Sequence, residues 1–364
     1  MRLPLTLSFY IGRYFLFWVV AVFLSLLSII FLFDIVELLR RAASKDDAGV
    51  RIVLQMALFK LPHMAQLMLP FAVLFGGMMS FWRLTRSQEL VVARAAGVSV
   101  WQFLAPPLVV AFLLALIKIG VFSPFASAMS ARFEHLESKY LKGRVSLLAV
   151  SDAGLWLRQP SERGHAVLSA GRIAQDSMEL GDVIVFLFEG QDRFVGRIDA
   201  RSATLEPGYW SLKQAMLSAE GRQTQRIDQY RIATELTSEK IQDSFAPPET
   251  LSFWDLPGFI ALLERAGFSA VRHKLYFHSL LAAPLLQCAM VLLAAIFTLR
   301  SARRGGTSIV VGSGVIIGFL VYFLSDLIFA LGMSARLPVA LAAWAPATVT
   351  TLLGLASLLH SEDG

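Results

Sequence analysis

The sequence is poor in cysteine and in charge. Its one cysteine among 364 residues, Cys288, lies inside an apolar run, so the sequence supports neither a disulfide framework nor a cysteine-based metal site. Only 16% of the residues are charged and 56% are hydrophobic, a composition that requires much of the surface to face lipid. The net charge of +6 is modest. It does not suit a nucleic-acid-binding protein, whose basic residues cluster on one soluble face.

A nucleotide-binding motif is also missing. The P-loop pattern G-x-x-x-x-G-K-[ST] occurs nowhere in the chain. That pattern supplies the backbone N–H groups and the lysine that hold nucleotide phosphates. We therefore expect no cofactor or metal on this chain itself.

Long apolar runs are the main feature that is present. A helix needs roughly 20 apolar residues to cross a bilayer, and six runs reach this length. They are Tyr14–Phe33, Leu61–Trp82, Val100–Phe122, Leu275–Leu299, Thr307–Phe329 and Leu337–Leu359. The sequence therefore predicts a polytopic α-helical membrane protein with six transmembrane helices.

Between the third and fourth runs the pattern changes. From about residue 131 to 250, apolar and polar residues alternate in short stretches such as "DVIVFLFEG" and "YRIATELTS". Such alternation is typical of antiparallel strands with one buried face, and this length is enough for a sandwich or a jelly roll. The predicted organisation is helices one to three over 1–130, an inserted all-β jelly-roll-like domain over 131–250, and a connector helix with helices four to six over 251–364. Pro257 is expected to open the connector helix and Gly267 to close it.

Six spans place both termini on one side of the membrane, and that side also receives the 83–99 and 300–305 loops. Basic residues in short loops favour the cytoplasm. The bias here favours cytoplasmic termini, although the first loop on the opposite side, "ELLRRAASK", is also basic.

The loop between the second and third runs reads "RLTRSQELVVARAAGVSVW". Ser87 suits an N-cap, Glu89 lies in the first turn where the helix dipole favours a carboxylate, and Gly97 can end the helix. We expect a short helix over about 84–98, with Leu90, Val91 and Arg94 on one side. From the residues alone it is either an ordinary interfacial helix in a basic loop or a docking helix for a soluble motor.

The stretch "RSQELVVARAAGVS" resembles the coupling-helix signature of the lipopolysaccharide-export permeases of the LptF/LptG family. The resemblance extends to "GLWLR" after the third span, to "SDLIFALGMSARLP" between the fifth and sixth, and to the order of spans and β-domain. Within the family the motif is more similar to the LptG branch, and the LptF-type subunit is the alternative.

The resemblance implies half of the membrane domain of an ABC transporter. Such a transporter extracts lipopolysaccharide from the outer leaflet of the bacterial inner membrane and passes it to a periplasmic bridge. The implied partners are an LptF-type permease, an LptB-type ATPase dimer that carries ATP and Mg, and an LptC-type protein with a membrane anchor and a β-domain. The β-domain of this chain would be periplasmic.

The resemblance also implies roles for particular residues. Coupling to the ATPase would involve Arg86, Glu89, Leu90 and Arg94. Lipopolysaccharide would be bound by Arg40 and Arg41, through its phosphates, and by apolar residues of the first and fifth spans, Phe31, Phe33, Ile316, Phe319 and Phe323.

This chain departs from its relatives at two of these places. Gln88 is an extra residue between the serine and the glutamate of the coupling motif. Asp34 occupies a position where relatives can show a lysine. Its carboxylate, like that of Glu37, would repel an anionic lipid unless it is paired, and Glu37 has the i,i+3 and i,i+4 spacing to pair with Arg40 and Arg41. Without the resemblance, these arginines could equally be an interfacial snorkelling cluster.

Two charges, Lys118 and Asp326, interrupt the third and fifth spans. Intramembrane charges usually pair or line a cavity, so they could form a pair at the outer end of the bundle, although Lys118 could also simply snorkel. A second class of function, an intramembrane serine protease, would need Ser313 to meet His63 or His278 at matched depth. A third, a structural anchor that presents the β-domain, explains the topology but not the short helix.

Overall fold

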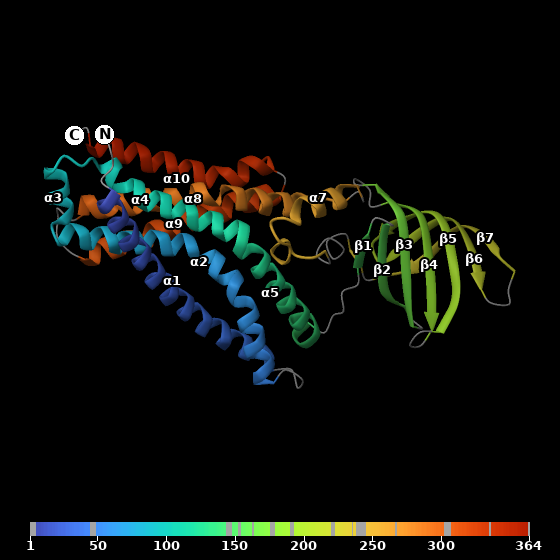
Figure 1. Ribbon diagram of the computed structural model, residues 1–364. Helices are drawn as coiled ribbons and strands as arrows, with labels where there is room; N and C mark the ends of the chain where they lie inside the picture. Colours follow the sequence, from blue (N-terminus) through green and yellow to red (C-terminus); the bar gives the residue numbers. More distant parts are fainter. Residues whose placement is uncertain are drawn as a thin grey trace. The chain divides into compact units, whose positions relative to one another are not determined.

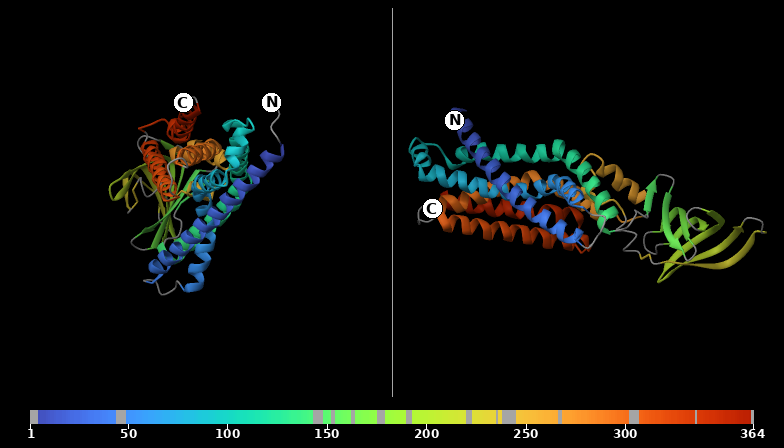
Figure 2. Two further views of the ribbon diagram at one scale, coloured as in Figure 1. Left: turned by 90° about the vertical axis from the view of Figure 1, so that its left-hand side faces the viewer. Right: turned by 90° about the horizontal axis from the view of Figure 1, so that it is seen from below.

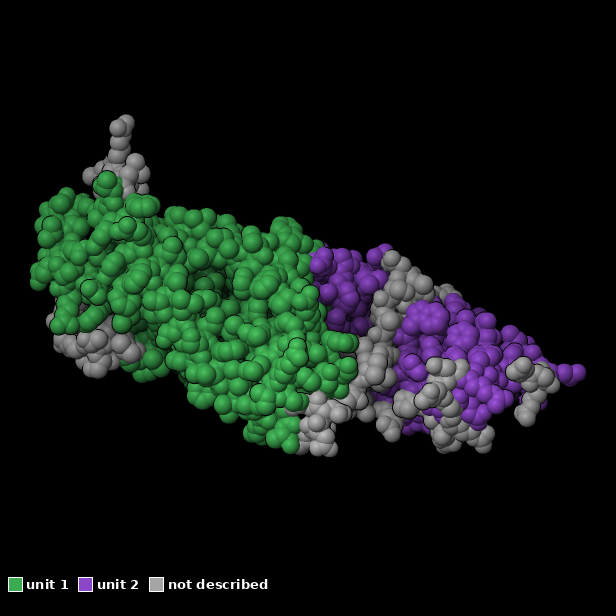
Figure 3. All heavy atoms as spheres, turned by 60° about the horizontal axis from the view of Figure 1, so that its bottom comes forward, with its two compact units in different colours: residues 1–141, 252–254, 273–364 green, residues 142–251, 255–272 purple. Residues whose placement is uncertain are grey.

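The computed structural model describes residues 5–43, 49–142, 148–151, 154–161, 164–174, 179–189, 193–219, 223–234, 236–237, 245–265, 268–301, 307–334 and 336–362. Gly267 and most of the 300–305 loop lie outside these residues. The chain divides into two compact units, coloured in Figure 3. The helical unit comprises residues 1–141, 252–254 and 273–364, and the β-unit comprises residues 142–251 and 255–272.

Among the described residues, the helical unit contains six helices that are long and apolar enough to cross a membrane, which confirms the six predicted spans. Figures 1 and 2 show the start of the first helix and the end of the last at one end of this unit, together with the short helix α3 (Glu89–Ala95). The spanning helices are α1 (Leu5–Ala42), α2 (Val50–Arg86), α4 (Val100–Ile117) with its continuation, α8 (Val271–Ser301), α9 (Thr307–Met333) and α10 (Val339–Glu362).

Helices α2 and α8 form the centre of the helical unit. In the most apolar 18-residue stretch of each helix, 56% of the residues of α2 and 61% of those of α8 are buried, against 11% for each of α1 and α9. The core contains Phe15, Phe81 and Leu104, all fully buried. Helices α1 and α2 approach each other closely at Gly76 of α2, where a Cβ would lie 2.6 Å from the Cα of Val19 on α1. Only a residue without a side chain permits this contact.

The third span is longer than the apolar run predicts. After α4 the helix passes through a π-helical turn, η1 (Lys118–Phe122), into α5 (Ser123–Leu136) and a second π turn, η2 (Glu137–Lys142). Pro124 has no N–H to donate to the carbonyl of Gly120, four residues earlier. The indole Nε1 of Trp254 donates to that oxygen at 3.2 Å instead. Helical structure thus continues past residue 131, where the composition changes.

The β-unit is built on one antiparallel sheet whose seven strands follow one another in sequence order. They are β1 (Leu148–Ser151), β2 (Gly154–Ser161), β3 (Gly164–Ala174), β4 (Glu179–Glu189), β5 (Arg193–Glu206), β6 (Tyr209–Ala219) and β7 (Gln225–Ala233). After β7 come the short turn η3 (Pro248–Thr250) and α7 (Leu256–Arg265).

One face of this sheet is the core of the β-unit. Leu168, Val185 and Ile198 from three strands are buried there, and Leu263 of α7 and Phe268 pack against the same face. The predicted insert of antiparallel strands between the third and fourth spans is therefore present. Its jelly-roll-like character is not confirmed, because a jelly roll requires Greek-key connections and the described strands form a meander.

Candidate functional sites

The predicted short helix between the second and third spans is present as α3, but its beginning differs from the prediction. Ser87 does not cap α3. Its backbone N–H donates to Arg83 O at 2.9 Å, so it ends α2. Gln88 instead precedes α3, in the left-handed conformation with φ +65°. The extra residue therefore lies in the turn between two helices and breaks the helical phase there.

The end of α3 is as predicted. Gly97 has φ +84°, its N–H donates to Arg94 O at 2.9 Å, and the N–H of Val98 donates to Ala93 O at 3.1 Å. This pair of bonds is the Schellman motif, in which a glycine in the left-handed region satisfies the last carbonyl groups. Ser99 then begins α4 with a capping box to Gln102.

The side chains of α3 divide into an anchor and an exposed face. Leu90 is only 5% exposed and belongs to the core of the helical unit, so it attaches α3 to the bundle. Val91 and Val92 are 54% and 67% exposed, and Arg94 is exposed as well. Leu90 and Arg94 are four residues apart on α3, so they share a side as expected, but Leu90 is buried whereas Val91 and Arg94 are exposed. Val92 was not predicted as a site residue. It could have been, because α3 buries only Leu90, and a second apolar residue left exposed on so short a helix is available to a partner.

Glu89 is held in place by this chain. Tyr10 Oη of α1 donates to Glu89 Oε2 at 3.0 Å, and Ser87 Oγ donates to Oε1 at 2.8 Å. Arg86 stacks over the ring of Trp82, 5.3 Å from its centroid. The carboxylate at the start of α3 is thus exposed but oriented, and α1 and α3 are tied together.

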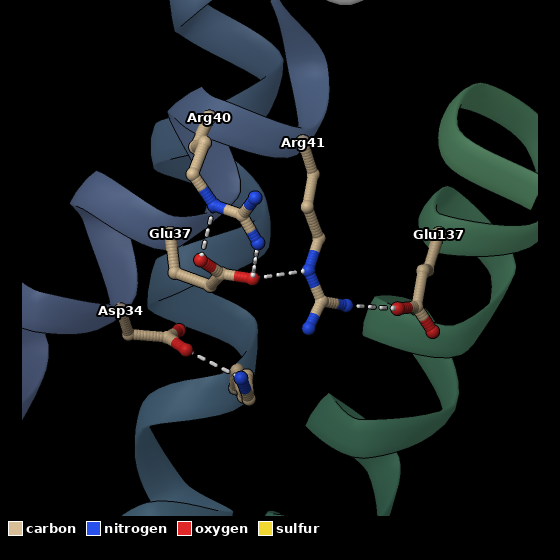
Figure 4. Close-up of polar contacts among 6 residues, drawn as sticks. Asp34, Glu37, Arg40, Arg41 and Glu137 are labelled. Atoms are coloured by element: carbon tan, nitrogen blue, oxygen red, sulfur yellow. Dashed lines mark hydrogen bonds and ion pairs between the residues drawn. The ribbon is translucent and has the colours of Figure 1, made fainter.

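A second site lies at the other end of α1. We name it the α1 charge cluster, and it consists of Asp34, Glu37, Arg40, Arg41, Lys60 and Glu137 (Figure 4).

Glu37 is the hub of this cluster. It accepts bonds from Arg40 Nε at 2.8 Å and from Arg40 Nη2 at 2.9 Å. It also accepts one from Arg41 Nε at 2.7 Å. The predicted pairing of Glu37 with both arginines is confirmed.

Two further contacts join α1 to its neighbours. Lys60 of α2 donates to Asp34, and Arg41 lies 3.6 Å from Glu137 of η2. Asp34 is therefore paired with a basic residue of the same chain. Sequence reasoning had not placed Lys60 in the site, because Asp34 and Lys60 are 26 residues apart. The cluster holds three acidic and three basic side chains and is neutral overall.

The apolar residues predicted to contact lipid lie mostly on open faces. On α1, Phe33 is 73% exposed, whereas Phe31 is half-buried against the packing of α1 and α2. On α9, the exposed fractions of Ile316, Phe319 and Phe323 are 61%, 64% and 54%. Phe319 and Phe323 stack with ring centroids 6.2 Å apart. Thus α1 and α9 carry large apolar surfaces that the described part of this chain does not cover.

The two intramembrane charges lie on different elements. Lys118 lies in η1 and Asp326 on α9, and no ion pair between them is found among the described residues. Their pairing stays a prediction.

Six described helices long and apolar enough to cross a membrane, an anchored short helix between the second and third, and a β-sheet between the third and fourth indicate a multi-pass membrane protein. The chain belongs to the lipopolysaccharide export system permease LptF/LptG family, whose family model matches residues 9–360. This family comprises membrane subunits of a transporter, not enzymes, so the protease alternative is set aside. The chain is a multi-pass inner-membrane protein.

Two relatives agree with this assignment. The lipopolysaccharide export system permease protein LptG of Escherichia coli (strain K12) is 24% identical over 361 residues, which cover 97% of this chain and 98% of that protein. LptG of Haemophilus influenzae is 25% identical over 338 residues, or 89% of each chain. The resemblance seen in the coupling motif therefore extends over nearly the whole sequence.

Proposed function

We propose that this chain is the LptG-type permease of an ATP-driven lipopolysaccharide exporter. It pairs with an LptF-type permease to extract lipopolysaccharide from the outer leaflet of the inner membrane toward a periplasmic bridge. An LptB-type ATPase dimer binds ATP and Mg and docks on α3, and an LptC-type protein receives the lipid. Both termini are cytoplasmic, and the β-unit is a periplasmic domain.

Family membership supports the class of subunit, and the exposed surface of α3 supports the proposed docking of the ATPase. Leu90 fixes this helix in the core of the bundle, while Glu89, Val91, Val92 and Arg94 remain exposed. A partner that binds this surface pushes on a rigid element, since α3 is joined to α1 through Tyr10 and to α2 through Ser87. Movement of the ATPase is thereby transmitted directly to two membrane helices.

The open faces of α1 and α9 support a lateral lipid route. Removing acyl chains from a bilayer costs roughly 0.8 kcal/mol for each methylene that loses its apolar surroundings. An apolar cavity between two permease subunits offsets most of that cost, and ATP hydrolysis supplies the rest. Phe33 on α1 and Phe319 and Phe323 on α9 would line it, each opposite a helix of the partner permease.

Docking on α3 can be tested with Val92→Asp. The substitution places a charge at an exposed apolar position without disturbing Leu90. We expect the assembled complex to lose most of its bound ATPase subunit in detergent, and lipopolysaccharide-stimulated ATP hydrolysis to fall at least tenfold. The matched control is Val195→Asp on β5, where the valine is 39% exposed, and it should behave as the unmodified protein does. Normal ATPase retention by Val92→Asp would argue against docking through α3.

A further inference from the structure

The α1 charge cluster neutralises its own basic residues. Every guanidinium and ammonium group in it contacts a carboxylate of the same chain, from Glu37, Asp34 or Glu137. An anionic head group that binds Arg40 through its Nε–Nη2 edge meets a carboxylate already there. It must replace Glu37, which accepts bonds from both of those atoms.

Exposure separates the replaceable carboxylate from the fixed ones. The side chains of Asp34 and Glu137 are 12% and 11% exposed, and each lies against a neighbouring helix. The side chain of Glu37 is 37% exposed, between Arg40 at 74% and Arg41 at 52%. An anion arriving from outside the protein therefore reaches the Glu37 pairs first.

The chemistry of exchange is favourable at this position. Arginine binds carboxylates and phosphates with the same planar fork of N–H donors, so a phosphate can take over the bonds that Glu37 now accepts. Exposed ion pairs contribute little net free energy because water solvates the separated partners well. Displacing Glu37 into water consequently costs little.

We propose that Glu37 is a displaceable counter-ion that competes with substrate phosphate for Arg40 and Arg41. This inference rests on the proposed function. The competition lowers the affinity of the site, and when the lipid moves on, Glu37 returns to both arginines. Asp34 and Lys60 form a fixed pair that holds α1 against α2 beneath the exchange site.

The test compares lipid binding by the complete transporter in nanodiscs with and without Glu37. The probes are lipopolysaccharide with its lipid A phosphates and the same lipid after dephosphorylation. Glu37→Gln should lower the Kd for the phosphorylated lipid roughly two- to fivefold, the range of one exposed ion pair. It should not change the Kd for the dephosphorylated lipid. Glu37→Asp keeps the charge and should bind as the unmodified protein does.

Glu264→Gln on α7 of the β-unit makes the same change in net charge at a residue that is not part of the cluster, and its Kd should be unchanged. If Glu37→Gln does not fold, Glu37→Ala carries the same prediction. Unchanged or weaker binding by the neutral variant, or equal tightening toward both lipids, overturns the counter-ion role. If the unmodified transporter binds neither lipid, the proposed function itself fails.

Discussion

At the residue scale, the α1 charge cluster contains two kinds of ion pair that differ in how well water reaches them. The Asp34–Lys60 pair is shielded, with side chains 12% and 25% exposed, whereas Arg40 is 74% exposed. Removing one partner of a shielded pair leaves an uncompensated charge, which costs far more than removing an exposed partner.

We therefore expect Lys60→Ala to lower the free energy of unfolding by about 1–3 kcal/mol, less than for a fully buried pair because some water reaches both groups. Arg40→Ala should change it little. The double variant Asp34→Asn/Lys60→Met removes both charges and should recover most of the loss. The measurement is thermal unfolding of the purified protein in detergent. Equal effects of Lys60→Ala and Arg40→Ala would contradict the distinction between fixed and exchangeable pairs.

The residue-scale contacts show what could be predicted from sequence and what could not. The Glu37–Arg40 and Glu37–Arg41 pairs follow from helical spacing alone, so they were predictable. Asp34–Lys60 and Tyr10–Glu89 join residues far apart in the chain, and no local pattern identifies them. Ser87 was misplaced because the preference of serine for helix N-caps does not reveal which of two adjacent helices the residue joins. The left-handed turn at Gln88 decided which helix it joined.

At the scale of helices, the crossing of α1 and α2 depends on Gly76. A Cβ at this position would meet backbone atoms of Val19 at 2.6 and 2.8 Å, and backbone cannot move aside as a flexible side chain can. The two helices would have to separate along their contact.

Gly76→Ala should therefore lower the free energy of unfolding by about 1–3 kcal/mol, the usual cost of overpacking. Gly312→Ala on α9 is the control, because nothing lies within 4 Å of its added Cβ, and alanine there should be neutral or slightly stabilising. Unfolding midpoints of the two variants measured side by side decide the question. A Gly76→Ala protein as stable as Gly312→Ala would mean that α1 and α2 do not approach this closely.

The extent of the helices was harder to predict than their existence. Apolar runs identified all six spans, since length and composition suffice for that. They did not reveal the continuation of the third span to Lys142, where π turns and polar residues follow the apolar part. The meander of the sheet could not be predicted either, because the alternation of apolar and polar residues predicts strands but not the order in which they pair.

At the scale of the whole molecule, α1 connects the docking helix with the candidate lipid site. α1 contacts Glu89 near its start through Tyr10, and it carries Arg40 and Arg41 in its last turn. A helix that touches the docking element at one end and the candidate lipid site at the other can couple the two by moving as a rigid body. If α1 couples the two sites in this way, a substitution at α3 should stop ATP-driven release of the lipid and leave lipid binding unchanged.

The most direct measurement is ATP-dependent release of lipopolysaccharide from proteoliposomes that contain the complete transporter, with Glu89→Lys compared against the unmodified chain. Reversing the charge breaks the contacts with Tyr10 and Ser87 but leaves the α1 charge cluster intact. We predict that the Glu89→Lys transporter binds lipopolysaccharide with unchanged Kd and loses at least nine-tenths of ATP-dependent release. Release at the unmodified rate would contradict the claim that the work of ATP hydrolysis enters this chain through α3.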